Sequence, residues 1–246
     1  MNKICIIVGH GKSKSGGYDS GAVSKDGKTH EFKVAKEIAK HCVDYLNANY
    51  DVKADLMNYD GSLYLTDRIK AVNKADYDFV AEIHLNAGGG TGTETYYYHG
   101  SPTGKKVADL ISKEISSALG VKQRSNGTDD GGDKVKLNDN GKDYFAIIRD
   151  TEPTAVLVET VFIDTASDLA KVKTVDGQKK CGVAIAKGIA KGKGLKAISK
   201  PVVNEKPVSK KLYRVCEGAY EYNTALERKE ALIKAGFKNA YLVEVE

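Results

Sequence analysis

The 246-residue sequence predicts an α/β fold: a twisted, mainly parallel sheet flanked by helices on both faces, plus a small C-terminal β-α-β module. Short continuous apolar runs recur at residues 3–8, 79–83 and 154–158, and segments of helical periodicity separate them. Runs that are apolar on both faces are typical of parallel strands covered on both sides. Each run ends beside a residue capable of chemistry, and parallel sheets bind ligands beyond the carboxyl ends of their strands. We therefore expect the three strand ends to share one crevice.

The first third of the chain alternates strands and helices. A Gly/Ser/Lys-rich loop follows the first strand and extends to Glu31. Within it, Gly11-Lys12-Ser13 resembles the end of a phosphate-binding loop, but that motif also requires a glycine where the chain has Ile6, which argues against nucleotide hydrolysis. Further elements are expected at 31–47 (helix), 52–56 (strand), 62–74 (helix) and 79–83 (strand).

The following segments complete the predicted sheet. We expect an edge strand at 93–98, a helix at 103–119 that Gly120 closes, a strand at 144–148, the last strand at 154–159 and helices at 164–173 and 176–191. The polar stretch 121–142 is long for a compact domain, which favours a substrate-facing loop. Its acidic residues do not have the spacing of a calcium-binding loop and are expected to be solvated: Asp129, Asp130, Asp133 and Asp139.

A change in composition predicts three parts. Residues 1–192 form the main domain, residues 193–211 are a linker without apolar periodicity, and residues 212–246 have a strand, helix, strand pattern. The last part is too small to hold a full core alone, so it is expected to pack on a neighbour or on a second copy of the chain.

Charge and cysteine usage limit the function classes. The formal net charge of +5 is mildly basic and is enough to favour anionic polymers such as cell-wall glycopolymers or nucleic acid. Dispersed lysines more often only keep a domain soluble, so we expect that role and no nucleic-acid partner. Cys5, Cys42, Cys181 and Cys216 lie far apart in apolar patterns and are expected to be buried reduced thiols. The sequence lacks a signal-peptide core and any stretch long enough to span a membrane, so neither a leader nor a membrane partner is expected.

Two histidines and a glutamate predict a metal site. His10 and His84 follow two of the predicted strands, and Glu31 falls on the inner stripe of the first helix, where an unpaired carboxylate is costly. Two imidazoles and one carboxylate are the ligand set of a catalytic zinc site that keeps one position for water. His30, on the side of the same helix, is the rival for Glu31 as third ligand.

Glu159 ends the last strand of the sheet and is the candidate general base for amide hydrolysis. A first-turn glutamate favoured by the helix dipole is the alternative interpretation of Glu31, and it predicts a solvent-facing side chain. Of the remaining histidines, His41 is expected on a helix surface, and His99 follows an aromatic strand where it could line a groove.

Several motifs occur in an order that resembles a known family. They are VGHG at 8–11, YDSGA at 18–22, Glu31 opening a helix, Arg68 with Asn73, EIHLNA at 82–87 and FAIIRDTEPTAVLVETVFIDTASD at 145–168. With these motifs, residues 3–192 resemble the zinc-dependent N-acetylmuramoyl-L-alanine amidases of the Amidase_3 type. The resemblance implies one Zn²⁺ per catalytic domain and cleavage of the amide between N-acetylmuramic acid and the L-alanine of the peptidoglycan stem peptide.

Matched motif by motif, the resemblance implies that His10, Glu31 and His84 are the zinc ligands and that Glu159 is the catalytic glutamate. Asn86 and Arg149, which lie in two of the motifs, are the expected substrate-binding residues. The chain departs from the family pattern at Glu82, where a serine commonly precedes the IH of the motif, and at Val161, where a glycine is frequent. Neither departure removes a ligand, but both leave the substrate subtype open.

The tail LYRVCEGAYEYNTALERKEALIKAGFKNAYLV is similar to half of a SPOR-type repeat, a family that binds peptidoglycan glycan strands. Because only one half is present, we expect residues 212–246 of two chains to pair into a homodimer. The whole layout resembles a phage or prophage endolysin, made in the host cytoplasm without a signal peptide and acting on the cell wall after release.

Two other functions remain open from the sequence. One is a peptidoglycan-binding protein of hydrolase fold that no longer turns over, and the other is a zinc peptidase that cuts within the stem peptide. The bacterial target, the stem-peptide type and the role of loop 121–142 do not follow from the sequence.

Overall fold

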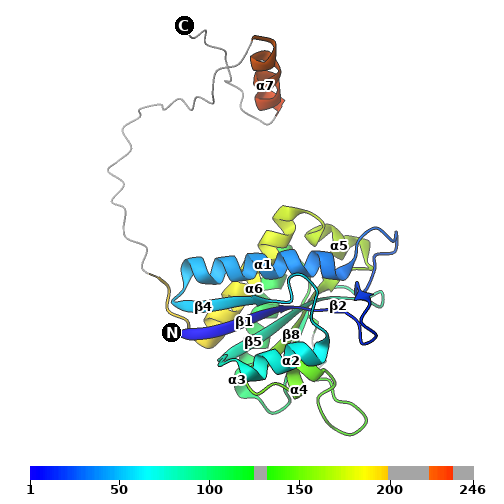
Figure 1. Ribbon diagram of the computed structural model, residues 1–246, viewed down its shortest axis with the longest axis vertical. Helices are drawn as coiled ribbons and strands as arrows, with labels where there is room; N and C mark the ends of the chain where they lie inside the picture. Colours follow the sequence, from blue (N-terminus) through cyan, green and yellow to red (C-terminus); the bar gives the residue numbers. More distant parts are fainter. Residues whose placement is uncertain (125–131, 199–221, 235–246) are drawn as a thin grey trace. The chain divides into compact units, whose positions relative to one another are not determined.

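The computed structural model describes residues 1–124, 132–198 and 222–234. The chain divides into two compact units, Met1–Ser199 and Lys200–Glu246. The second unit contains the helix α7 (Tyr222–Lys234), drawn in red-orange in Figure 1. The two strands expected on either side of that helix lie outside the described residues, as does Cys216.

A six-stranded sheet forms the centre of the first unit (Figure 1). Its strands, in spatial order, are β4 (Val52–Met57), β1 (Asn2–Val8), β5 (Phe79–Asn86), β8 (Thr154–Phe162), β6 (Glu94–Tyr97) and β7 (Asp133–Lys134). The strands from β4 to β8 are parallel, and β6 is antiparallel to β8. This confirms the predicted α/β class with a mainly parallel sheet.

Helices cover both faces of the sheet because its central strands are apolar on both sides. One face packs on α1 (Glu31–Asn49), α3 (Pro102–Leu119), α5 (Ala166–Val172) and α6 (Val175–Lys193). The other face packs on α2 (Leu65–Lys74) and the short α4 (Ala146–Arg149). In β1, for example, Ile4 and Ile6 belong to the first core and Cys5 and Ile7 to the second, all with no exposed surface.

The helix boundaries follow from local chemistry. At the start of α3 the Ser101 hydroxyl accepts a hydrogen bond from the backbone N–H of Gly104 at 3.0 Å. Gly120 ends the same helix in the left-handed region with φ 64°, as the sequence predicts. The second helix begins at Leu65, three residues later than the predicted Ser62.

The predicted strand at 144–148 is wrong, because its second half is the helix α4. The consecutive residues Ile147 and Ile148 are both buried in the same core cluster, whereas a strand would direct them to opposite faces. A four-residue apolar run is too short for its periodicity to distinguish these two structures.

The predicted edge strand at 93–98 is also corrected. It forms β6, but β6 lies between β8 and β7, because Thr95 and Tyr96 pair with the two residues of β7. The expectation that Asp133 is solvated is therefore wrong, since this residue of β7 is buried with 6% of its surface exposed. Asp139 is exposed as expected, and Asp129 and Asp130 lie outside the described residues.

The loop after β1 is more regular than expected, since it contains the hairpin of β2 (Gly11–Lys12) and β3 (Tyr18–Asp19). Cys5, Cys42 and Cys181 are buried free thiols. Across the parts of the chain that the structure covers, no helix combines the length and apolarity needed to cross a membrane.

Close packing of α6 against its neighbours depends on glycines. A Cβ at Gly182 would lie 2.5 Å from the carbonyl oxygen of Ile38 on α1, and one at Gly188 would lie 2.5 Å from the Cα of Ile111 on α3. Because real Cβ atoms do not approach so closely, the larger side chains of other residues are excluded at both positions.

We expect Gly188→Ala to lower the free energy of unfolding by about 1–3 kcal/mol, because overpacking against α3 outweighs the better helix propensity of alanine. Lys179→Ala, on the exposed side of the same helix, is the matched control and should change stability by less than about 0.5 kcal/mol. Denaturant unfolding measures both values. A stabilised Gly188→Ala protein would contradict the close contact between α6 and α3.

Candidate functional site

Three neighbouring strands bring the predicted site residues together at one end of the sheet. In the parallel ladder of β1 and β5, Val8 is opposite Ile83, so the chain leaves β1 at Gly9 and His10 beside His84. In the next ladder, His84 is directly opposite Glu159 of β8. The carboxyl ends of β1, β5 and β8 therefore meet, as the sequence predicts from their endings.

His10 occupies an uncommon backbone conformation, with φ at 61°. Two buried side chains hold this turn in place. The Asn58 amide donates hydrogen bonds to the carbonyl oxygens of Val8 and His10, each at 2.8 Å. The Arg68 guanidinium donates to the same His10 carbonyl at 2.6 Å. The surrounding structure thus fixes a strained residue at the point where its imidazole is needed.

Glu31 is the first residue of α1, and only 3% of its surface is exposed. Its carboxylate accepts backbone hydrogen bonds from Ala22 at 2.8 Å and from Leu85 at 3.0 Å. It also lies 2.9 Å from His84 Nδ1 and 3.1 Å from His10 Nε2. The solvent-facing alternative for this glutamate is therefore wrong.

The nitrogen and oxygen donors of His10, Glu31 and His84 all lie within 4.8 Å of one another, which is close enough for one metal ion. Two imidazoles and a carboxylate match the donor set that zinc prefers. In the described part of the chain this is the one such group, and His30 is not part of it. Behind His10, Asp19 Oδ2 lies 2.9 Å from Nδ1, which leaves Nε2 to face the group.

Glycines make room for this cluster. A Cβ at Gly9 would lie 2.2 Å from Cε1 of His84, and a Cβ at Gly21 would lie 2.6 Å from a Glu31 oxygen. Gly21 also has φ 67°, which most side chains disfavour. The glycines of the VGHG and YDSGA motifs therefore serve the site by leaving space for its donor groups.

The charges of the cluster reinforce one another in the metal-free protein. Burial alone would raise the pKa of Glu31, but hydrogen bonds with His10 and His84 outweigh it and hold that pKa far below its usual range. Burial acts to lower the pKa of both histidines, yet their carboxylate partners raise it above the ordinary value, most strongly for His84. The carboxylate and the two imidazoles therefore stabilise one another's charged forms.

Glu159 differs from Glu31 in having few partners. Its Oε2 atom is buried and has no hydrogen-bond partner among the described residues. Burial, with smaller contributions from the carboxylates of Glu31 and Glu94, raises the pKa of Glu159 to about 7 against the opposing effect of His84. A carboxylate with a pKa near neutrality can both accept and return a proton.

Glu94 is a site residue that the sequence interpretation missed. It lies directly opposite Glu159 in the antiparallel ladder of β6 and β8, and only 3% of its surface is exposed. Its carboxylate accepts hydrogen bonds from four side chains: Asn86 at 2.6 Å, Tyr96 at 3.0 Å, Arg124 at 2.8 Å and Lys134 at 2.5 Å. The sequence did contain a signal for Glu94, because a glutamate is unusual in a predicted strand that otherwise consists of threonine and tyrosine.

The structure places the two predicted substrate-binding residues differently. Asn86 ends β5 next to His84 and is held by Glu94, so it belongs to the cluster. Arg149 ends α4 and donates to the Asp150 carboxylate and to the carbonyls of Asp143 and Tyr144, rather than to the four predicted catalytic and metal residues.

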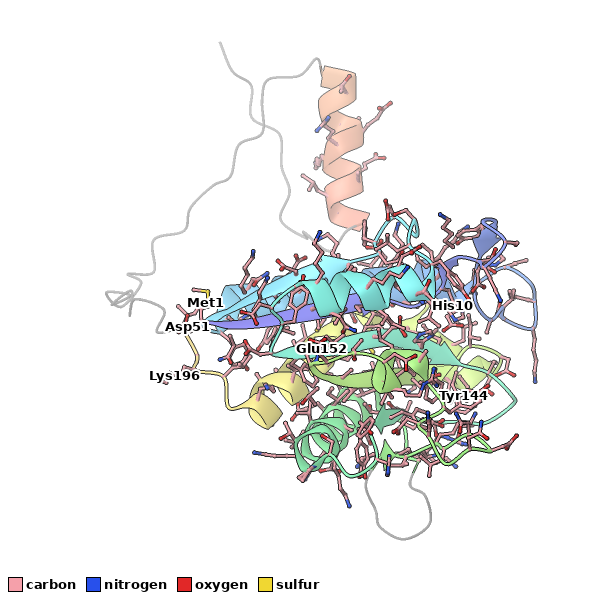
Figure 2. The ribbon with its side chains drawn as sticks, turned by 60° about the horizontal axis from the view of Figure 1, so that its bottom comes forward. Met1, His10, Asp51, Tyr144, Glu152 and Lys196 are labelled. Carbon is pink, nitrogen blue, oxygen red and sulfur yellow. The ribbon has the colours of Figure 1, made fainter. Side chains whose placement is uncertain are left out.

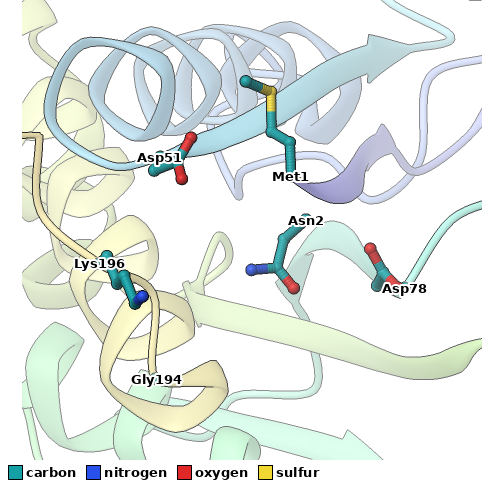
Figure 3. A pocket seen from close by; sticks show the side chains of 6 residues that line it. All are labelled: Met1, Asn2, Asp51, Asp78, Gly194 and Lys196. Atoms are coloured by element: carbon teal, nitrogen blue, oxygen red, sulfur yellow. The ribbon is translucent and has the colours of Figure 1, made fainter.

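Two other positions lie apart from the cluster. His99 is about half exposed and pairs with Asp143 at 3.1 Å. A surface hollow lies at the opposite, amino-terminal end of the strands, where Figure 2 labels Met1, Asp51 and Lys196 far from His10. Figure 3 shows the side chains that line it, which are Met1, Asn2, Asp51, Asp78, Gly194 and Lys196. This lining includes neither a histidine nor a nucleophile, so the hollow is not the candidate active site.

Comparison with known proteins agrees with this geometry. The Amidase_3 family, described as N-acetylmuramoyl-L-alanine amidase, matches residues 4–191. A sporulation-specific N-acetylmuramoyl-L-alanine amidase of Bacillus subtilis (strain 168) is 31% identical over 90% of this chain and 76% of its own length. The endolysin of Bacillus phage SPP1 is 30% identical over 86% of this chain and 74% of its own length.

A solved structure gives the same result for the fold. The catalytic domain of CwlV, an N-acetylmuramoyl-L-alanine amidase from Bacillus (Paenibacillus) polymyxa var. colistinus, superposes with a TM-score of 0.66 at 28% sequence identity. The match covers 80% of this chain and 100% of that domain, so the additional residues of this chain have no counterpart there.

We expect zinc binding to release protons and to tighten as the pH rises through the range in which His10 and His84 titrate. The reason is that zinc binds neutral imidazoles, whereas the carboxylate partners of both rings raise their pKa and favour the protonated forms. Calorimetry in buffers of different ionisation enthalpy measures the released protons. His99→Ala should leave the release unchanged, and an affinity independent of pH would contradict the assignment of the two rings.

Proposed function

Because the chain belongs to the Amidase_3 family of N-acetylmuramoyl-L-alanine amidases, we propose that it is a zinc-dependent peptidoglycan hydrolase. Its substrate is the amide between N-acetylmuramic acid and the L-alanine of the stem peptide. The observation that carries the proposal is the group of His10, Glu31 and His84, whose donors lie within 4.8 Å of one another. His84 is opposite Glu159, whose buried Oε2 has no hydrogen-bond partner in the described part of the chain.

His10, Glu31 and His84 would hold the zinc ion. When bound there, zinc supplies Lewis-acid chemistry that polarises an amide carbonyl and makes water a better nucleophile at neutral pH. The fit rests on the donor set and on the backing of His10 by Asp19, because a carboxylate partner behind a histidine ligand fixes its orientation.

Glu159 moves the proton in this mechanism. Hydrolysis adds the oxygen of water to the carbonyl carbon and breaks the bond to the amide nitrogen. Glu159 takes the proton that water gives up and returns it to the nitrogen, so that L-alanine leaves with a free amino group. The raised pKa of this carboxyl group, about 7, suits both halves of the transfer.

Asn86 and Glu94 orient the substrate side of the site. Asn86 donates its amide to Glu94, and its Oδ1 accepts from the backbone N–H of Ala87 at 2.8 Å, so its side chain is fixed before substrate binds. Glu94 also holds Arg124 and Lys134 on the side of β6 next to Glu159. Arg149 remains our second candidate for substrate binding, and because it contacts Asp150, Asp143 and Tyr144 it would bind substrate away from the reacting amide.

For the biological role we propose that of an endolysin. The similarity to the endolysin of Bacillus phage SPP1 supports it, together with the similarity of the layout to lysins. In this role the protein is made in the host cytoplasm and degrades the cell wall after release.

The tail is proposed to be a separate SPOR-like module. We assign residues 1–192 to catalysis, 193–211 to a linker and 212–246 to wall binding or dimerisation. The helix α7 (Tyr222–Lys234) supports this division, because it overlaps the helix expected at 225–235 and begins three residues earlier. Half of a SPOR repeat is completed most simply by the same segment of a second chain, which gives a homodimer.

Digestion of purified peptidoglycan by the zinc-loaded protein should release free L-alanine amino termini and leave the glycan intact. Glu159→Gln should lower kcat by about 10²–10⁴-fold with unchanged zinc content, because it removes the proton acceptor but keeps the shape of the side chain. Mass spectrometry of the fragments is the measurement. Cleavage within the stem peptide would contradict the amidase assignment and favour a zinc peptidase. A zinc-loaded protein without activity would favour a wall-binding protein instead.

The proposed dimer predicts a mass of twice the 26.6 kDa monomer in sedimentation velocity of the full chain. A chain that ends at Ser199, the boundary of the first compact unit, should sediment as a monomer because it lacks the pairing segment. If both forms sediment as monomers at high concentration, the pairing of the tails is wrong, and if both are dimers, the contact lies in the first unit.

A further inference from the structure

A second buried carboxylate lies against the metal cluster. Glu82 precedes His84 by two residues on β5, so both side chains are on the same face of the strand. Only 2% of Glu82 is exposed. A buried carboxylate is costly unless each oxygen has a partner.

The two oxygens of Glu82 have different partners. Oε2 lies 3.2 Å from His84 Nε2 in hydrogen-bond geometry. Oε1 lies 3.2 Å from the Nε atom of Arg68, which is an ion-pair distance, but neither of these two atoms has a hydrogen-bond partner among the described residues. Arg68 is itself buried, with 5% exposed, and its Nη1 donates to the carbonyl oxygen of His10. One chain of contacts therefore runs from the ring of His84 through Glu82 and Arg68 to the backbone of His10.

These contacts determine which nitrogen of His84 carries its proton. A neutral imidazole has one N–H and one lone pair, and a carboxylate keeps the N–H on the nitrogen that it faces. Both nitrogens of His84 face a carboxylate, because Glu82 lies 3.2 Å from Nε2 and Glu31 lies 2.9 Å from Nδ1. A metal ion held by Glu31 and His10 would take the place of the proton on Nδ1, and Glu82 would then keep the remaining proton on Nε2. His10 is the mirror case, because Asp19 faces its Nδ1 and leaves Nε2 toward Glu31.

We infer that Glu82 is a positioning residue for zinc. It holds the His84 ring in the tautomer whose Nδ1 lone pair points at Glu31 and His10, and Arg68 fixes Glu82 in that position. The inference rests on the zinc site of the proposed function. Glu82 is not a fourth ligand, because its near oxygen approaches the His84 nitrogen that faces away from the other donors.

The competing explanation is that Glu82 only neutralises Arg68. Two variants separate the two roles, since both remove the charge that faces Arg68. Glu82→Gln keeps an oxygen that can accept the hydrogen bond of His84 Nε2, whereas Glu82→Leu keeps the volume without an acceptor. If Glu82 is only a counter-ion of Arg68, both variants should change the zinc affinity equally. If Glu82 positions His84, the glutamine variant should keep the zinc affinity that the leucine variant loses.

The measurement is the zinc dissociation constant of the full chain, determined by competition with a chromophoric chelator. We expect Glu82→Leu to weaken zinc binding by about 10–100-fold and Glu82→Gln to stay within a few-fold of the parent. Equal affinities in all three proteins, or equal losses in both variants, would overturn the inference. Failure of the parent to bind zinc would instead overturn the proposed function on which the inference rests.

A spectroscopic measurement covers the case in which Glu82→Leu does not fold. Long-range ¹H–¹⁵N correlation spectra of the zinc-loaded parent report the tautomer of each histidine. We expect the proton of His84 on Nε2 and that of His10 on Nδ1. A proton on Nδ1 of His84 would contradict the positioning role without any variant.

Discussion

The site depends on the burial of one carboxylate between two imidazoles. Glu31 begins α1, yet its oxygens accept hydrogen bonds from the loop before the helix, through Ala22, and from the central strand, through Leu85. The same oxygens contact His10 and His84. Helix, loop and two strand ends are thus joined at one group, and removal of a partner from such a buried ionic cluster typically costs about 3–5 kcal/mol.

A second layer of carboxylates surrounds this group, each from a different element. Asp19 on β3 backs His10, Glu82 on β5 backs His84, and Glu94 on β6 holds Asn86 next to Glu159. Each of these acids has a specific basic or amide partner, whereas the buried Oε2 of Glu159 has no hydrogen-bond partner in the described part of the chain. This difference in hydrogen bonding supports the proposal that Glu159, rather than Asp19 or Glu94, transfers the proton.

Residue patterns predicted the sheet, its three converging strand ends and the inward position of Glu31, because burial of apolar runs and the cost of a buried charge are local in sequence. They did not predict α4, since a run as short as Phe145–Ile148 fits either a helix or a strand. They also missed the pairing of β6 with β7, which depends on two residues from a polar stretch far along the chain. The same pairing brings Lys134 of β7 to Glu94, so this contact of Glu94 could not be predicted either.

The unequal embedding of the two key glutamates has an evolutionary consequence. Substitution of Glu31 would remove hydrogen bonds that connect the helix, the loop and the strand, so the fold itself would be selected against. Substitution of Glu159 breaks no hydrogen bond at its buried Oε2 among the described residues. If proteins of this fold lose activity and persist as binding proteins, they should therefore lose the glutamate at the position of Glu159 first. They should retain the glutamate at the position of Glu31.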